Sequence, residues 1–182
     1  ASDVYKRQVV QIVDAAPADD FANAITIPIS TGPNSETLGL LGFDADQNDL
    51  TSESGESHTC NGDSHADNTA WFTFTPPAGS GTRSWQIQVD APNSFGDDAD
   101  LTLYSGSTLG GLAELVCLQM GDTEEQTLVT TLTAGTTYPI QIGVDAVQIN
   151  TEFFIRIEPA VVRATPQRIH GCLLYTSDAA DE

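Results

Sequence analysis

The side chains best suited to hold a ligand begin with a polar run at residues 44–49. Asp44, Asp46 and Asn48 place side-chain oxygens at alternate positions, as the first half of a calcium loop does. Asp49 stands where such a loop has its central glycine, and no glutamate closes the loop at the usual place. The run is therefore a candidate calcium site of looser geometry, with a solvated acidic loop as the alternative.

A second acidic cluster holds Asp97, Asp98 and Asp100. Three carboxylates this close repel one another, so either a hard cation or full hydration must relieve them. Calcium is the one cofactor that the two clusters suggest, and a hydrated loop is again the alternative.

The cysteines allow one disulfide within the body of the chain. Cys60 precedes a central aromatic strand and Cys117 lies on a later one, while Cys172 belongs to an atypical tail. We expect Cys60 and Cys117 to be bridged, which implies an oxidising, extracellular or cell-surface location; two unpaired core thiols are the alternative. His58 and His65 flank Cys60 without the spacing of a zinc site.

No group of residues has the pattern of a catalytic centre. Ser64 and His65 lack the surrounding glycines of a nucleophile elbow. Carboxylate pairs for glycoside hydrolysis cannot be told from surface acids by spacing. We therefore predict that the chain is not an enzyme, with a carbohydrate-active enzyme as the remote alternative.

Composition limits the partners. The 182 residues include 26 acidic and 6 basic ones, for a net charge of −20. Such a chain is unsuited to nucleic acid or an anionic membrane, and favours cations, basic partners or simple solubility. No apolar run reaches the length of a membrane span.

Both chain ends differ from the rest. Residues 1–8 and 172–182 resemble translated sequencing-adapter read-through, and we exclude them from fold reasoning as non-native ends. If they are non-native, the native gene has room to extend beyond residues 9 and 171; native tails are the alternative.

Alternating apolar residues predict strands through most of the remaining chain. The central strand carries Trp71 and Thr73 on one side and Phe72 and Phe74 on the other, and it ends at Pro76. We expect Trp71 in the core between two sheets. Further strands are predicted at 9–13, 25–30, 38–43, 85–90, 101–104, 115–118, 128–132, 138–144 and 153–157.

These elements predict an all-β fold, a jelly-roll-like antiparallel β-sandwich with one short N-terminal helical turn at 19–24, capped by Asp19 or Asp20. Pro28 marks the 25–30 strand as an edge, and the strands at 137–144 and 151–158 are less well guarded edges. The expected division is an N-terminal strand and connector at 9–16, a sandwich at 17–158 and a linker at 159–171.

Five motifs in order resemble the bacterial pre-peptidase C-terminal (PPC-like) domains over about residues 17–158. They are Asp19–Ala24 (D-D-x-x-x-A), Thr51–Glu56 (T-x-E-x-G-E), Trp71–Pro77 (W-F-x-F-T-P-P), Leu101–Gly106 (L-x-L-Y-x-G) and Ala134–Tyr138 (A-G-T-x-Y). The resemblance implies a jelly-roll-like accessory module that binds matrix, carbohydrate or neighbouring domains. Gly96–Asp100 and Leu118–Asp122 depart from the family pattern, so calcium binding is not carried over.

Two functions follow as hypotheses. The first is a non-catalytic structural or binding module of a bacterial secreted or surface protein, whose partner is a protein or polysaccharide of the extracellular matrix. The alternative is a self-assembling filament subunit, in which Val9, Val10, Ile12 and Val13 add a strand to the next copy, as in adhesion filaments.

Overall fold

The computed structural model describes residues 11–14, 18–31, 37–45, 50–57, 60, 68–90, 99–120, 125–144 and 151–160. Within these ranges the regular structure is β-strand with two 3-10 turns, so the chain is an all-β sandwich as predicted. None of the helical turns in this part of the chain is long and apolar enough to cross a membrane.

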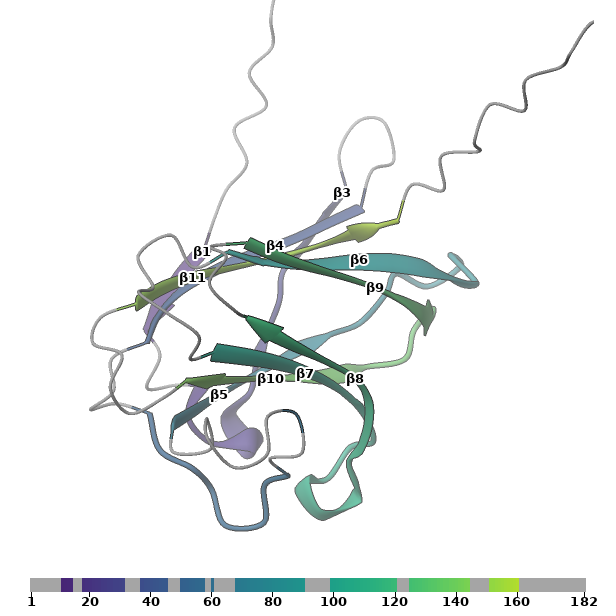
Figure 1. Cartoon of the computed structure of the whole chain (residues 1–182). Helices are drawn as coiled ribbons and strands as arrows, with labels where there is room; N and C mark the ends of the chain where they lie inside the picture. Colours follow the sequence, from purple (N-terminus) through teal and green to yellow (C-terminus); the bar gives the residue numbers. More distant parts are fainter. Residues whose placement is uncertain are drawn as a thin grey trace, which may run out of the picture.

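The strands form two sheets stacked as layers (Figure 1). The six-stranded sheet has the order β1-β4-β11-β6-β9, with β3 also paired to β4. Its strands are β1 (Gln11–Asp14), β3 (Ile29–Thr31), β4 (Thr37–Ala45), β6 (Thr82–Asp90), β9 (Glu125–Thr133) and β11 (Thr151–Pro159).

The five-stranded sheet has the order β2-β5-β10-β7-β8. Its strands are β2 (Ile25–Thr26), β5 (Asn68–Phe74), β7 (Ala99–Ser105), β8 (Ala113–Met120) and β10 (Tyr138–Val144). The 3-10 turns are η2 (Phe21–Asn23), at the predicted helical turn, and η3 (Leu109–Gly111), which was not predicted. Pairing is antiparallel except for β1 with β4 and β2 with β5.

Period-two alternation explains the core between the layers. Phe72 and Phe74 of β5 point inward, and Phe74 meets Trp85 of β6 edge to face with ring centroids 5.1 Å apart. The prediction for Trp71 is wrong in its face: the side chain is fully buried but lies outside this inter-sheet core, on the outer side of β5. Alternation correctly separated Trp71 from Phe72 but could not say which side the second sheet covers.

Pro28 divides what was predicted as one edge strand. β2 pairs with β5 in one sheet and β3 pairs with β4 in the other, so the chain changes sheet at Pro28. Ile27 is buried at this crossing and Pro28 is exposed. A residue without a backbone N–H suits the point where the chain leaves one ladder for the other.

The predicted edges at 137–144 and 151–158 are also wrong. β10 lies between β5 and β7, and β11 lies between β4 and β6, so both are central strands. Pro139 is therefore no edge guard; it lies opposite Thr73 in a central pair. Local sequence does not report which strands have two neighbours, because neighbours come from distant segments.

The N-terminal strand lies on its own sandwich. Gln11–Asp14 pairs in parallel with residues 41–44 of β4. β1 is therefore an edge strand of its own sheet, which is the alternative to exchange of this strand with another copy. Val9 and Val10 lie outside the described residues, and the filament role of Val9, Val10, Ile12 and Val13 stays a prediction.

Candidate binding face

The two outer faces of the sandwich differ in what covers them. We call the outer side of the five-stranded sheet the covered face; it carries Thr69 and Trp71 of β5, Gln141 of β10 and Tyr104 of β7. All four side chains are buried. Residues 50–57 pass along this side of the sheet, below it in Figure 1.

Glu56 is the centre of the hydrogen bonds under the cover. Its carboxylate accepts the Trp71 indole Nε1–H at 2.7 Å, the Thr69 hydroxyl at 2.9 Å and the Gln141 amide Nε2–H at 3.3 Å. Bonds to an ionised acceptor are stronger than bonds between neutral groups. One carboxylate thus satisfies three donors that the sheet would otherwise leave buried and unpaired.

Trp71 fills the space beneath the cover. Its ring meets Phe21 of η2 edge to face at 5.1 Å and Tyr104 at 5.8 Å, between ring centroids. The indole therefore contributes apolar area on its faces and a hydrogen bond at its nitrogen, the usual combination for a buried tryptophan.

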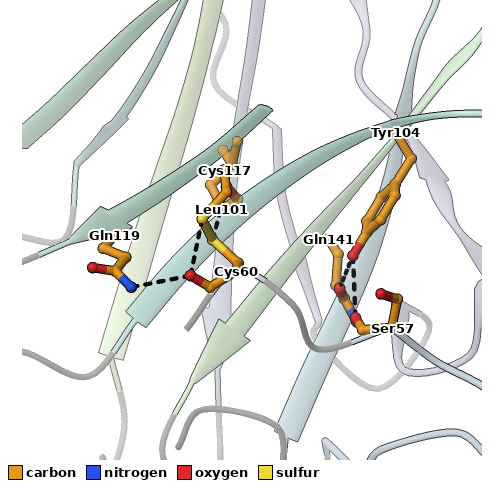
Figure 2. The surroundings of a disulfide bond; sticks show 7 residues. All are labelled: Ser57, Cys60, Leu101, Tyr104, Cys117, Gln119 and Gln141. Atoms are coloured by element: carbon orange, nitrogen blue, oxygen red, sulfur yellow. Dashed lines mark hydrogen bonds between the residues drawn. A yellow bond between two sulfur atoms is a disulfide. The ribbon is translucent and has the colours of Figure 1, made fainter. Parts of the chain in front are cut away.

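Tyr104 completes the polar contacts of this face. Its hydroxyl lies 2.9 Å from Gln141 Oε1 and 3.1 Å from the Ser57 carbonyl oxygen, and Figure 2 shows it pointing at both. Burial raises the pKa of Tyr104 to about 12, because the phenolate loses hydration. The group therefore acts as a neutral hydrogen-bonding anchor at ordinary pH.

The cover is also tied to η2. Asp19 accepts hydrogen bonds from the Thr51 backbone N–H and from its hydroxyl, and Glu53 accepts the Phe21 N–H at 3.1 Å. Of the two predicted N-cap residues, Asp20 is the N-cap of η2, although its side chain makes no capping hydrogen bond, and Asp19 binds Thr51 instead. Hydrogen bonds thus join three of the motifs to one another: Asp19–Ala24, Thr51–Glu56 and Trp71–Pro77.

A disulfide fixes the far end of the cover. Cys60 and Cys117 are bonded, with their Cα atoms 5.3 Å apart, and the predicted pairing is confirmed (Figure 2). Gln119 donates its side-chain amide to the Cys60 carbonyl at 3.0 Å. The covered face is thus closed by both covalent and hydrogen-bonded contacts, which makes it a structural region rather than a ligand site.

The outer side of the six-stranded sheet, which we call the open face, carries a grid of polar side chains. Arg156, Gln88 and Thr127 form one row across β11, β6 and β9, and the next row includes Glu158 and Gln86. Thr127 is exposed, and the other four are half-exposed. Neighbouring strands space these groups about 4.8 Å apart.

Arg156 has a fixed geometry within the grid. Its Nη2 donates to Glu158 at 2.8 Å, and the two side chains remain 42% and 30% exposed. A guanidinium has five donors, so this one bond leaves capacity for a ligand. Phe154, half-exposed two residues earlier on the same strand, adds an aromatic ring beside the polar rows.

The predicted calcium ligands fall mostly outside the described residues. Asp46, Asn48, Asp97 and Asp98 all lie there, and only the backbone of Asp44 can be placed, on β4. Asp100 is buried on β7. Across the described ranges, no group of three or more histidine, cysteine or acidic side chains is arranged for a metal. Calcium stays a prediction.

The residues of the open face were not predicted as a site. Gln86, Gln88 and Arg156 occupy the polar positions of the alternating strands predicted at 85–90 and 153–157. The usable signal is that these outward positions carry amides and hydroxyls in a chain rich in acids. That they meet in rows depends on the pairing of β11, β6 and β9, segments far apart in sequence.

No protein-family model matches the sequence, and no curated protein matches it. Similar solved structures include a CBM4 carbohydrate-binding module, with 10% identity, 73% of this chain and 77% of that chain covered, and a TM-score of 0.34. The CBM22-1 xylan-binding domain of Paenibacillus barcinonensis Xyn10C shares 11% identity over 83% of this chain and 97% of that one, with a TM-score of 0.32. At TM-scores this low, the likeness carries no argument about ligand or function.

Proposed function

We propose that this chain is a non-catalytic extracellular binding module that holds a neutral polysaccharide on its open face. The observation that carries the proposal is the solvent-accessible row of Arg156, Gln88 and Thr127 across three neighbouring strands. Amide, hydroxyl and guanidinium groups donate and accept hydrogen bonds with sugar hydroxyls. The ring of Phe154 offers an apolar surface for the carbon face of a sugar.

Charge favours a neutral ligand over a charged one. The described side chains of the open face include one positive group, the guanidinium of Arg156, and two negative groups, the carboxylates of Asp90 and Glu158. The whole chain has a net charge of −20, which repels an anionic polysaccharide. A basic protein would need a denser group of carboxylates than this face provides. A protein partner is the competing outcome of the test below.

The disulfide supports a secreted or surface location, because such bonds persist in oxidising compartments. Membership among the PPC-like domains is part of the same proposal. It is supported by the hydrogen bonds that join three of the resembling motifs around Glu56, Glu53 and Asp19. An accessory module of that kind needs no catalytic group of its own.

The test is binding to a panel of neutral polysaccharides by affinity electrophoresis and calorimetry. We expect Arg156→Ala and Gln88→Ala to weaken binding about ten-fold or more while the melting temperature stays nearly unchanged. Ser107→Ala, at an exposed position before η3, is the matched control and should bind as wild type does. Failure of the wild-type protein to bind any neutral polysaccharide, or equal binding by all three variants, would overturn the proposal.

A further inference from the structure

Val129 is the most exposed large hydrophobic residue in the described part of the chain, with an exposed fraction of 60%. Strand pairing sets it opposite Gln86, and Gln86 opposite Glu158, so Val129 stands on the open face at the β9 end of the second polar row. One exposed apolar residue needs no explanation by itself. Val129 shares its face with the half-exposed Phe154, however, and these two are the large apolar side chains that β11, β6 and β9 present there.

Phe154 and Val129 lie on opposite sides of the first polar row, which has Gln88 at its centre. The row of Phe154 reaches β9 at Glu125, four residues before Val129. Gln88 therefore lies halfway along a diagonal that begins at Phe154 on β11 and ends at Val129 on β9. Because strands are about 4.8 Å apart and rise about 3.4 Å per residue, this diagonal is about 17 Å long.

We propose that the open face binds, along this diagonal, an internal segment of a linear neutral polysaccharide whose sugar rings carry their hydroxyls equatorially. This rests on the function proposed above and names the class of sugar that the same face takes. An equatorially substituted pyranose has hydroxyls around its rim and C–H groups on both faces. Such a ring lays a C–H face on Phe154 or Val129, and its rim hydroxyls meet the amide and guanidinium groups of the polar row. An axial hydroxyl would place a polar group against an apolar side chain and leave it unpaired.

The length of the diagonal makes binding depend on the length of the ligand. About 17 Å exceeds the reach of a disaccharide, so a short ligand contacts Phe154 or Val129 but not both. A longer chain contacts both, and its second contact forms at the high effective concentration set by the first. β9 is the last strand in the order of its sheet, so no other strand of that sheet lies in the path of a ligand that continues past Val129. Recognition therefore needs no free chain end.

The test is titration calorimetry of the full chain with β-1,4-linked glucose oligosaccharides from the disaccharide to the hexasaccharide, because glucose carries all of its ring hydroxyls equatorially. We expect the hexasaccharide to bind about ten-fold more tightly than the disaccharide, or better. Reduction of its terminal sugar to the alditol should leave the affinity nearly unchanged. The β-1,4-linked mannose hexasaccharide has the same linkage and an axial 2-hydroxyl, and it should bind about ten-fold less tightly.

Two substitutions test the ends of the diagonal. Val129→Thr keeps the shape and the strand preference of the side chain but replaces a methyl group by a hydroxyl, so hexasaccharide binding should weaken about four-fold. Phe154→Ala should weaken it about ten-fold. The two positions are more than about 10 Å apart, so the double variant should lose the product of the two factors. Leu115→Thr, at an exposed residue of β8 in the other sheet, is the matched control and should bind as wild type does.

Failure of this inference can be told apart from failure of the proposed function. Binding of neutral polysaccharides that is independent of chain length, tighter for mannose than for glucose chains, or unaffected by Val129→Thr overturns the inference and leaves the proposed function standing. Losses that do not multiply in the double variant show that one ligand does not span both ends, and they overturn it equally. A wild-type chain that binds no neutral polysaccharide overturns both.

Discussion

The open and covered faces are built from the same kind of strand but have opposite surroundings. On the covered face, Thr69, Gln141 and Tyr104 point outward from their sheet and are nevertheless buried. On the open face, Gln88 and Arg156 occupy equivalent outward positions and remain half-exposed. The difference comes from two segments, η2 and residues 50–57, which lie together over one sheet. An outward-facing polar residue can therefore be either part of the interior or part of a binding surface.

The largest effect should come from the aromatic ring under the cover. Trp71→Ala should lower the free energy of unfolding by about 3–5 kcal/mol, because the ring is fully buried and leaves a cavity. Phe154→Ala on the open face is the matched control and should cost about 1 kcal/mol. Denaturant unfolding measures both. Equal losses in the two variants would show that the faces do not differ as described.

The disulfide should come next. Replacing Cys60 and Cys117 together by serine removes a cross-link between residues 57 apart in sequence. The chain-entropy model gives a loss of up to about 4 kcal/mol in the free energy of unfolding. The open face should still bind its ligand, since no part of the cross-link reaches it. Unchanged stability, or free thiols at both positions by mass spectrometry of the native protein, would contradict the covalent closure.

Glu56→Gln tests the hydrogen bonds at the centre of the cover. The amide keeps the size of the side chain but loses the charge and part of the accepting capacity for Trp71 and Gln141. We expect a loss of about 2 kcal/mol in the free energy of unfolding. Glu158→Gln, on the open face, should change stability by less than about 0.5 kcal/mol. The reverse order of these two losses would be evidence against the central position of Glu56.

Tyr104→Phe should have the smallest effect at neutral pH, about 1 kcal/mol, from the lost contacts with Ser57 and Gln141. Its pH dependence is more informative. Folding raises the pKa of Tyr104 from 10.0 to about 12, so its contribution is complete below pH 10 and is lost as the pH rises towards 12. The phenylalanine variant should lose less stability over this interval. Parallel unfolding curves for the two proteins above pH 10 would show that the hydroxyl is not buried.

Local chemistry alone predicted much of this molecule. Alternating apolar residues identified the strands, the proline pair after Phe74 ended β5, and two cysteines in the body of the chain allowed one disulfide. Alternation also separated Trp71 from Phe72 correctly. The strands and their ends depend on residues close in sequence, and the disulfide follows from there being only two cysteines in the body of the chain. The sequence is therefore enough to predict these features.

Only the tertiary structure determined whether a given side of each strand faces the core, the cover or solvent. Trp71 is under the cover and not between the sheets, β10 and β11 are central and not edges, and Pro28 lies between two sheets. The neighbours of a strand come from segments far apart in the sequence. Alternation along a strand shows only that successive side chains point to opposite sides of the sheet. Whether a direction leads to core, cover or solvent is set by long-range pairing and by where a connecting segment folds back.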